Sequence, residues 1–382
     1  MSTYVNGQPY DLAIVGAGII GQALAYHAAK RGMRVGVFER SGAPQGASIR
    51  NFGLIWPIGQ PTGPRFQLAL DSLRHWEVLA GEAGLDLRRT GSLHLAYRDE
   101  EMTVLEDFTA NHLGHGHQCR LVGVDEVGAM SQVARLDGLK GALWSGTECQ
   151  ISSPQALPRI AQYLQAGLDV LFHWHHAVTA VEPGVLSAGG AQYRANRIVV
   201  CPGADLDTLF PKLLQGAGLR PVRLQMLAAQ PARAQELGPA LCAGLTLLHY
   251  PAFETCGALP SLRKILQAQA PEATAHGVHI LLSQHASGEF IIGDSHDHDP
   301  NPSPFNSEAV DAVILRHLAD MTVPLDLRIT RRWQGVYVNP PKGESTLLHP
   351  AEGVWIITGL GGAGMTLSLG LTAKWLAETF GA

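Results

Sequence analysis

The sequence contains few cysteines and few clustered basic residues. Only five cysteines occur in 382 residues, without a Cys-x-x-Cys pair, which argues against a disulfide framework and against a zinc site. Lysine and arginine total 28, and they form no cluster longer than Arg331-Arg332, so no nucleic-acid partner is predicted. No apolar run approaches the length of a membrane span, and no basic segment followed by an apolar stretch opens the chain. We therefore expect a cytoplasmic protein without membrane attachment.

Histidine, in contrast, is abundant, with 17 residues. The densest run of histidine and aspartate is Gly293-Asp294-Ser295-His296-Asp297-His298-Asp299-Pro300. Such residues can bind metals, but the prolines at 300, 302 and 304 are typical of a solvated loop. We predict a loop here, and no metal site in the protein.

The most informative segment is Asp11 to Arg40. An apolar run over 12–15 predicts a buried parallel strand, and a Gly-x-Gly-x-x-Gly turn follows it. Glu39 then comes at the end of a second strand, where a carboxylate can bind ribose hydroxyls. Strand, turn, helix, second strand and acidic residue are all in register, which predicts a dinucleotide site but does not separate FAD from NAD. The predicted contacts are Gly16, Gly18, Ile19, Ile20, Gly21 and Glu39.

A second glycine turn lies near the C-terminus. A hydrophobic strand over 353–358 runs into Gly359-Leu360-Gly361-Gly362-Ala363-Gly364-Met365-Thr366, and a terminal helix extends from Thr366 to Phe380. The start of such a helix presents free amides and a positive dipole end to an electron-rich ligand. A reduced flavin carries negative charge at N1 and the C2 carbonyl. The two glycine turns together favour a flavin.

Between these turns the pattern predicts an α/β fold of two interleaved domains. Helices are expected over 63–84 and 154–166, and strands over 90–97, 170–172, 177–181 and 197–201. From 221 to about 325 the pattern indicates strands and irregular loops, with strands over 224–228, 279–283 and 289–292. We expect a doubly wound, Rossmann-like FAD-binding domain of residues 1–88, 150–220 and 326–382. A second, α+β substrate domain on a mixed sheet would take residues 89–149 and 221–325.

A third segment, Ala47-Ser48-Ile49-Arg50-Asn51-Phe52-Gly53, follows soon after Glu39. With the N-terminal motif, the Cys201-Pro202-Gly203-Ala204 turn and the terminal glycine loop, it resembles the glycine oxidase, sarcosine oxidase and D-amino-acid oxidase family of FAD enzymes. That resemblance implies hydride transfer from the carbon beside an amine to flavin N5, giving an imine and, with molecular oxygen, hydrogen peroxide. It also implies further FAD contacts at Arg40, Ala47, Ser48, Arg50, Asn51, Val178, Gly203, Gly361, Gly362, Ala363, Gly364, Met365 and Thr366.

Two positions depart from the family pattern. The arginine that clamps a substrate carboxylate in the amino-acid oxidases is replaced by Tyr337, and an arginine of the glycine oxidases is replaced by Gly362. Planar arginine is the natural bidentate carboxylate ligand, so a plain α-amino acid is a doubtful substrate. Gly335 stands where the sarcosine oxidases carry a flavin-linking cysteine, so we expect noncovalent FAD.

The run Trp56-Pro57-Ile58-Gly59-Gln60 is similar to that of FAD oxidoreductases associated with phosphonate breakdown. This resemblance implies a substrate such as 2-aminoethylphosphonate or its N-methyl derivative. The candidates for binding the phosphonate group are Arg50, Arg65, Arg223, Arg331 and His249. The predicted residues of the substrate pocket are Arg50, Trp56, Tyr250 and Tyr337.

Other readings of the sequence remain open. One is an oxidase of a glycine-like or sarcosine-like amino acid. Another is a hydroxy-acid dehydrogenase that passes electrons to a carrier and uses a histidine base. A third is an FAD-binding subunit without chemistry of its own. We expect a small-molecule amine and molecular oxygen as partners, and we assign no catalytic residue and no oligomeric state.

Overall fold

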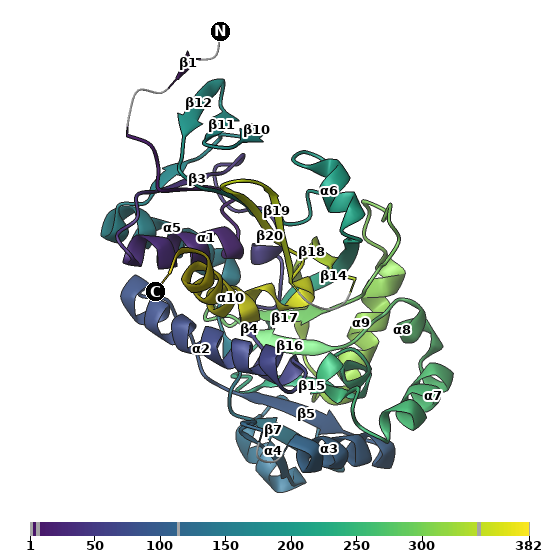
Figure 1. The fold of residues 1–382 in the computed structure, drawn as a ribbon. Helices are drawn as coiled ribbons and strands as arrows, with labels where there is room; N and C mark the ends of the chain where they lie inside the picture. The colour runs from purple at the N-terminus through teal and green to yellow at the C-terminus, as the bar shows by residue number, and fades with distance from the viewer. Residues whose placement is uncertain (1–2, 5–7, 113–114, 342–344, 382) are drawn as a thin grey trace.

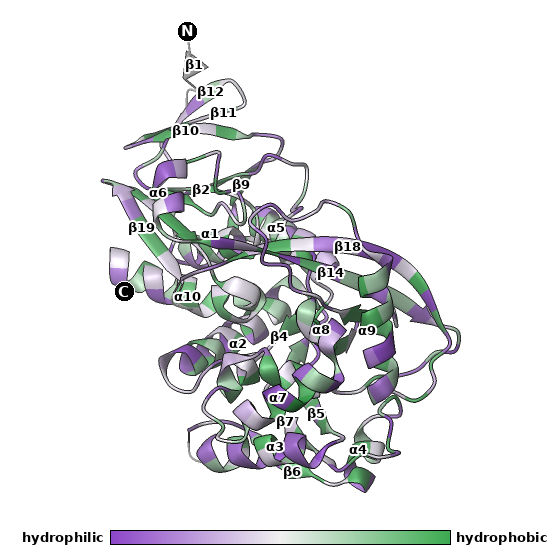
Figure 2. Cartoon of the chain, turned by 90° about the vertical axis from the view of Figure 1, so that its right-hand side faces the viewer, coloured by the Kyte–Doolittle hydropathy of each residue, from purple (hydrophilic) through white to green (hydrophobic). Residues whose placement is uncertain are grey.

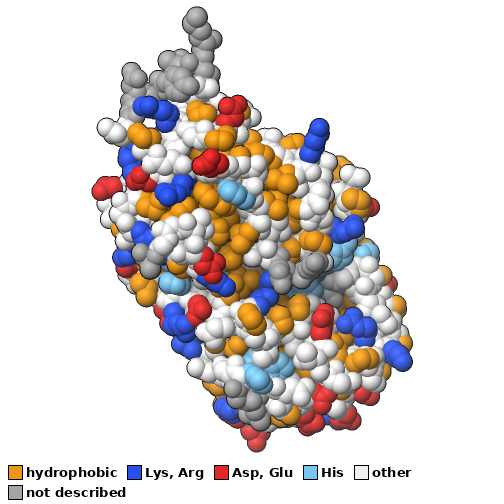
Figure 3. Space-filling view, in the orientation of Figure 1, with side chains coloured by type: hydrophobic (Ala, Val, Ile, Leu, Met, Phe, Trp, Pro, Cys, Tyr) orange, Lys and Arg blue, Asp and Glu red, His pale blue; other side chains and the backbone are white. Residues whose placement is uncertain are grey.

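The computed structural model describes residues 3–4, 8–112, 115–341 and 345–381. Two large sheets, each with its own helices, lie one above the other in Figure 1. Hydrophobic residues follow the inner strands, and hydrophilic residues gather on the outer helices (Figure 2). On the face seen in Figure 3, the Lys and Arg side chains are interspersed with those of Asp and Glu. No described helix is both long and apolar enough to cross a membrane.

The upper sheet has six strands in the order β19-β20-β13-β2-β3-β9. Every neighbouring pair is parallel except β19 with β20 at the edge. Its strands are β2 (Leu12–Val15), β3 (Val35–Phe38), β9 (Leu171–His173), β13 (Ile198–Val200), β19 (Thr346–Ala351) and β20 (Val354–Thr358). Central parallel strands are buried on both faces, which explains why β2 and β3 are apolar runs without alternation.

Successive side chains of this sheet face different layers. Leu12 and Ile14 pack in a core with helices, whereas Ala13 and Phe38 pack against a small four-stranded sheet. The helices of the first layer are α1 (Ile19–Lys30), α2 (Pro64–Ala83), α5 (Ser153–Leu168) and α10 (Gly364–Phe380). The second layer consists of β1 (Thr3–Tyr4), β10 (Val178–Glu182), β11 (Val185–Ala188) and β12 (Ala191–Arg194). The predicted α/β class is therefore correct, but strands cover the face on which a doubly wound pattern predicts helices.

The lower sheet has eight strands in the order β18-β14-β17-β16-β15-β5-β7-β6, and it is mixed because β15 and β5 run parallel. Its strands are β5 (Ser92–Ala96), β6 (Cys119–Val122), β7 (Gly141–Ser145), β14 (Arg220–Pro231), β15 (Ala240–Ala243), β16 (Leu281–Gln284), β17 (Phe290–Gly293) and β18 (Leu327–Asn339). A short pair, β4 (Leu54–Ile55) with β8 (Cys149–Gln150), forms a separate ribbon.

The region expected to hold only strands and loops also contains helices. These are α7 (Leu259–Gln269), α8 (Pro271–Ala275) and α9 (Glu308–Met321). The expected strands are present as β14, β16 and β17, but the helices were not predicted. Leu259, Leu262 and Leu266 of α7 are buried at helical spacing, which is the signal the sequence reading missed. The remaining described helices are α3 (Asp99–His112), α4 (Val124–Met130) and α6 (Pro211–Gly216).

Strand β18 bears on the predicted division of the chain. It falls within residues 326–382, which the sequence analysis gave to the FAD-binding domain, yet it pairs along its length with β14 of the lower sheet. We therefore assign β18 to the substrate sheet. The rest of the division stays a prediction.

Candidate flavin and substrate site

The predicted dinucleotide turn lies at the carboxyl end of β2. The strand order reverses at β2, because β3 pairs with it on one side and β13 on the other. Gly16 has a φ of 102°, which favours glycine. A Cβ added to Gly16 would lie 2.5 Å from the backbone oxygen of Cys201, and one added to Gly21 would lie 2.0 Å from that of Gly16. These two glycines are therefore needed for close packing of strand, turn and helix. The crevice at such a reversal is where open α/β sheets bind ligands.

Helix α1 begins at this turn without a capping side chain from Gly18. The amide of Ile19 donates to Ser48 Oγ at 2.9 Å, and a Cβ on Gly18 would lie 3.1 Å from that same oxygen. The amides of a first helical turn, here including those of Ile20 and Gly21, have no partner within the helix. A pyrophosphate fits this arrangement, because an anion satisfies the amides and the positive dipole end.

The adenosine side of the predicted site contains Glu39 at the end of β3. Its carboxylate accepts hydrogen bonds from the amides of Ala17 at 2.9 Å and Ser41 at 3.0 Å, which fixes it beside the glycine turn. Val178 is buried on β10. Gly203 is held near the sheet because its carbonyl accepts from Thr358 Oγ1 at 3.0 Å. Arg40 forms an exposed ion pair with Asp205, so its guanidinium already has a protein partner.

The Ala47 to Gly53 segment folds as a short helical turn, η1 (Ala47–Ile49), and a loop. Asn51 ties the segment together: its amide donates to the carbonyls of Ala47 at 2.9 Å and Ser48 at 3.0 Å. Arg50 is exposed and donates to the carbonyl of Gln334 on β18 at 3.2 Å. A Cβ at Gly335 would lie 2.9 Å from the backbone oxygen of Arg50, so a cysteine there would need this segment to move.

The C-terminal glycine loop forms η5 (Gly361–Ala363), and α10 starts at Gly364, two residues before the predicted start. Its first turn is fixed from two sides. Thr366 Oγ1 accepts from the amide of Trp56 at 2.9 Å, and the carbonyl of Met365 accepts from Trp76 Nε1 at 2.7 Å. Gly362 is exposed, and a Cβ there would lie 3.8 Å from the Tyr337 hydroxyl. The loop therefore meets the lower sheet at Tyr337.

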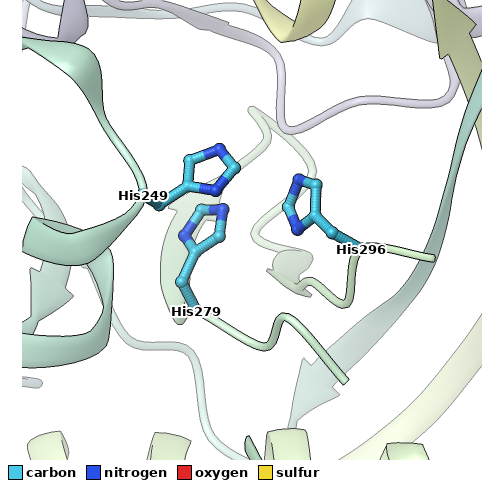
Figure 4. Close-up of side chains that lie close together, drawn as sticks. All are labelled: His249, His279 and His296. Atoms are coloured by element: carbon cyan, nitrogen blue, oxygen red, sulfur yellow. The ribbon is translucent and has the colours of Figure 1, made fainter. Parts of the chain in front are cut away.

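Three of the four predicted pocket residues belong to one chain of aromatic side chains. The ring centroids of Trp56 and Tyr250 are 6.0 Å apart, and those of Tyr250 and His249 are 5.1 Å apart. His249 stacks on His279 at 4.0 Å, and His296 lies 6.4 Å from Tyr337. We call His249, His279 and His296 the histidine cluster (Figure 4). Arg50 has no ring contact with this chain among the described residues.

The sequence analysis missed His279 and His296, and it placed the second of them in a solvated loop. That expectation was wrong for the start of the 293–300 run, because Asp294 is 2% exposed and His296 9%. The reason is backbone pairing beyond the strand ends. The amide of His279 donates to the carbonyl of Asp294 at 3.1 Å, and the amide of Asp294 donates back to His279 at 2.8 Å.

The arginines considered as phosphonate ligands already have protein partners. Arg223 pairs with Asp297 at 3.0 Å, and Arg331 pairs with Glu289. Arg65 donates to the side chain of Gln60 at 2.9 Å and to the carbonyl of Leu360 at 3.4 Å. Arg65 therefore lies beside the C-terminal glycine loop.

Burial sets the protonation of the aromatic and histidine side chains. It raises the pKa of Tyr250 and of Tyr337 above the ordinary value, and the carboxylate of Asp294 adds to this effect in both. It lowers the pKa of His279 to about 3. His249 is accessible to solvent, yet the protein that surrounds it lowers its pKa well below the usual range. At neutral pH the tyrosines are therefore hydroxyl donors and these histidines are uncharged.

Comparison with known proteins agrees with this geometry. The chain is 28% identical to a glycine oxidase of Geobacillus kaustophilus over 226 residues, which cover 56% of this chain and only 60% of that relative. It is 25% identical to one of the subunits of an opine oxidase from Rhizobium meliloti over 350 residues, or 87% of this chain and 83% of that one. The crystal structure of the Geobacillus kaustophilus glycine oxidase matches its fold with a TM-score of 0.77 at 21% identity, covering 97% of this chain and 94% of that one.

A more distant structural match agrees with the fold. The structure of an L-alpha-glycerophosphate oxidase from Mycoplasma pneumoniae with FAD bound matches with a TM-score of 0.72 at 15% identity, over 97% of this chain and 95% of that one. The family match itself covers residues 11–379, nearly the whole chain, and its description is FAD dependent oxidoreductase. The protein thus belongs to the DAO family of FAD-dependent oxidoreductases, and its cofactor is FAD.

Proposed function

We propose that this enzyme oxidises a small amine that carries a phosphonate group, such as 2-aminoethylphosphonate or its N-methyl derivative. The observation that carries the proposal is that Tyr337 lies next to Gly362, where an added Cβ would be 3.8 Å from the Tyr337 hydroxyl. These are the two positions where the resembling oxidases place carboxylate-clamping arginines. The protonated tyrosines Tyr250 and Tyr337 lie in one chain of aromatic side chains with the histidine cluster. All three histidines of the cluster are uncharged at neutral pH, because burial also lowers the pKa of His296 to about 3. A tetrahedral phosphonate can accept hydrogen bonds from such donors in directions that a planar carboxylate cannot use.

The chain's own residues would bind and orient the amine. Trp56 is 4% exposed, and its amide is held by Thr366 Oγ1, so this aromatic ring is fixed to the first turn of α10. Tyr250 and Tyr337 would bind the acid group and keep the carbon beside the nitrogen facing the cofactor. When bound, FAD supplies the hydride acceptor. No side-chain base is required if the amine arrives uncharged.

A second candidate is oxidation of a glycine-like or opine-like amino acid. The match to a protein named as part of an opine oxidase, over 87% of this chain, favours it, and the same name is a reason to look for a partner chain. Molecular oxygen is the electron acceptor we propose in either case. A hydroxy-acid dehydrogenase or a subunit without chemistry of its own would behave differently in the following test.

The test is an anaerobic screen of flavin bleaching with amines, amino acids, hydroxy acids and aminophosphonates. We expect bleaching by an aminophosphonate and stoichiometric peroxide when air is admitted. Turnover with a carrier alone would favour a dehydrogenase, and bleaching only by an amino acid would favour the second candidate. If no compound bleaches the flavin of the full chain, the proposal of a catalytic subunit is wrong.

The glycine loop should also tune the flavin. We expect Gly362→Asp to lower the flavin reduction potential and slow bleaching, because a carboxylate near N1 opposes the negative charge of the reduced state. The new Cβ would make only an ordinary 3.8 Å contact with Tyr337, so the fold should tolerate it. Gly362→Asn is the matched uncharged control. Equal potentials in the two FAD-loaded variants would mean that this loop lies away from the isoalloxazine.

A further inference from the structure

The histidine cluster has the composition of a metal site, and its ring nitrogens lie close to one another. One nitrogen from each of His249, His279 and His296 can be chosen so that all three lie within 4.8 Å of one another. The residues come from three separate segments: His249 follows η3 (Gly244–Leu248), His279 precedes β16 and His296 follows β17. Figure 4 shows the rings of His249 and His279 next to each other, with His296 facing them.

Each imidazole has a nitrogen available for a ligand. Nδ1 of His296 lies 3.0 Å from the carbonyl of Gly277, which can only accept, so Nδ1 carries the hydrogen and Nε2 keeps its lone pair. Nδ1 of His279 is buried without a hydrogen-bond partner. Neither ring nitrogen of His249 forms a hydrogen bond with another described residue. Neutral imidazole is the form that binds metal, and a backbone carbonyl on the second nitrogen is a common support for such a ligand.

A buried carboxylate, that of Asp294, lies beside the cluster. Oδ1 of Asp294 lies 3.0 Å from His279 Nε2 and 3.9 Å from His296 Nδ1. Across the residues that the structure describes, neither Lys nor Arg pairs with Asp294. This Oδ1 is buried without a hydrogen-bond partner among the described residues, which is costly, and a cation in the cluster would offset that cost.

We propose that His249, His279 and His296 bind a divalent first-row transition-metal ion, with Zn²⁺ as the type case. Bonds of roughly 2.0–2.1 Å place neighbouring nitrogens of a tetrahedral zinc site about 3.3 Å apart. The cluster must therefore contract, and the stacking of His249 on His279 must open. His249 can make this movement because its side chain is accessible to solvent, whereas His279 is 3% exposed and held by backbone pairing.

Three protein ligands leave one coordination position for another molecule. The cluster contacts Tyr250 through His249 and approaches Tyr337 through His296. An oxygen of the substrate acid group would take the open position, and the metal would supply the positive charge that the missing arginines do not. This last consequence rests on the proposed function, whereas metal binding itself does not.

The experiment is calorimetric titration of chelator-treated, FAD-loaded protein with Zn²⁺, repeated with Co²⁺ so that the visible absorption of the bound ion reports its ligands. We expect one equivalent per chain. His279→Gln should lower the affinity by about a hundredfold, and His249→Gln, at an accessible position, should do so without loss of FAD. His317→Gln is the control, because that histidine lies on α9 beside Asp320 and outside the cluster.

Several results would overturn the site: no stoichiometric Zn²⁺ binding by the wild-type protein, or unchanged affinity in a folded His249→Gln protein. Loss of binding in the His317→Gln control would assign the metal elsewhere and would equally count against the proposal. Because the titration needs no substrate, it is independent of the bleaching screen. Zinc binding without oxidation of any aminophosphonate would leave the metal site standing and reject the proposed function.

Discussion

A Gly18→Val protein should fold and yet purify without FAD. Gly18 has a φ of −68° and extended backbone, so valine meets no backbone strain at this position. Its Cβ would lie 3.1 Å from Ser48 Oγ, and its methyl groups would extend in front of the free amides of α1. A pyrophosphate must approach those amides closely, which a β-branched side chain prevents. FAD per chain, measured by acid release and absorbance, should fall from one to near zero, and circular dichroism should stay unchanged.

The matched control is Gly81→Val. Gly81 is an exposed residue of α2, and a Cβ there meets no atom within 4 Å. This variant carries the same change of side chain away from the predicted phosphate site, so it should retain all of its FAD. Stoichiometric FAD in a folded Gly18→Val protein would contradict the assignment of the phosphate site. Wild-type flavin that stays in the acid pellet would show that the cofactor is covalently bound.

The second large effect concerns the acid group of the substrate. We expect kcat/KM for 2-aminoethylphosphonate, or for its N-methyl derivative, to exceed that for glycine and sarcosine by roughly a hundredfold, because a lost bidentate charged contact costs about 3 kcal/mol. Tyr337 and Gly362 stand where the resembling oxidases place that contact for carboxylates. Peroxide release under identical buffer conditions is the measurement.

The sharpest comparison is between 2-aminoethylphosphonate and β-alanine, which differ only in the acid group. Equal kcat/KM for this pair would show that the pocket does not discriminate between a phosphonate and a carboxylate. A higher value for glycine or sarcosine than for both phosphonates would overturn the preference and favour the amino-acid candidate.

Local signals in the sequence predicted the glycine turns and several helices around the candidate flavin site. Gly21 packs against the backbone of Gly16, and Gly16 packs against Cys201 at the end of the adjacent parallel strand β13. The spacing of the glycines in the motif is therefore enough to predict this local geometry. The helices α2 and α5 were predicted within a few residues because their buried side chains repeat at helical spacing. The start of α10 was placed two residues late, since Gly364 and Met365 are a weak signal for a helix start.

The histidine cluster depends on pairing between segments that are distant in the chain. The spacing of residues within a single motif does not reveal such pairing. His249, His279 and His296 are 30 and 17 residues apart, and no local motif joins them. Reading 279–283 and 289–292 as an antiparallel hairpin would have brought His279 opposite Asp294 and Ser295, because β16 and β17 pair Leu281 with Gly293. The arginines were harder to judge, since their ion-pair partners lie far away in the sequence, as Arg223 and Asp297 do.

The order of strands in the upper sheet has a consequence for biosynthesis. Strands β2 and β3 lie near the start of the chain, β13 in its middle and β20 close to its end, yet β13 is hydrogen-bonded to both β2 and β20. During translation the glycine turn after β2 emerges from the ribosome long before the strands that complete its sheet. Pairing between such distant segments is slow, and unpaired strand edges are prone to aggregation. Nascent chains of this enzyme should therefore depend on chaperones until Val354–Thr358 has been released.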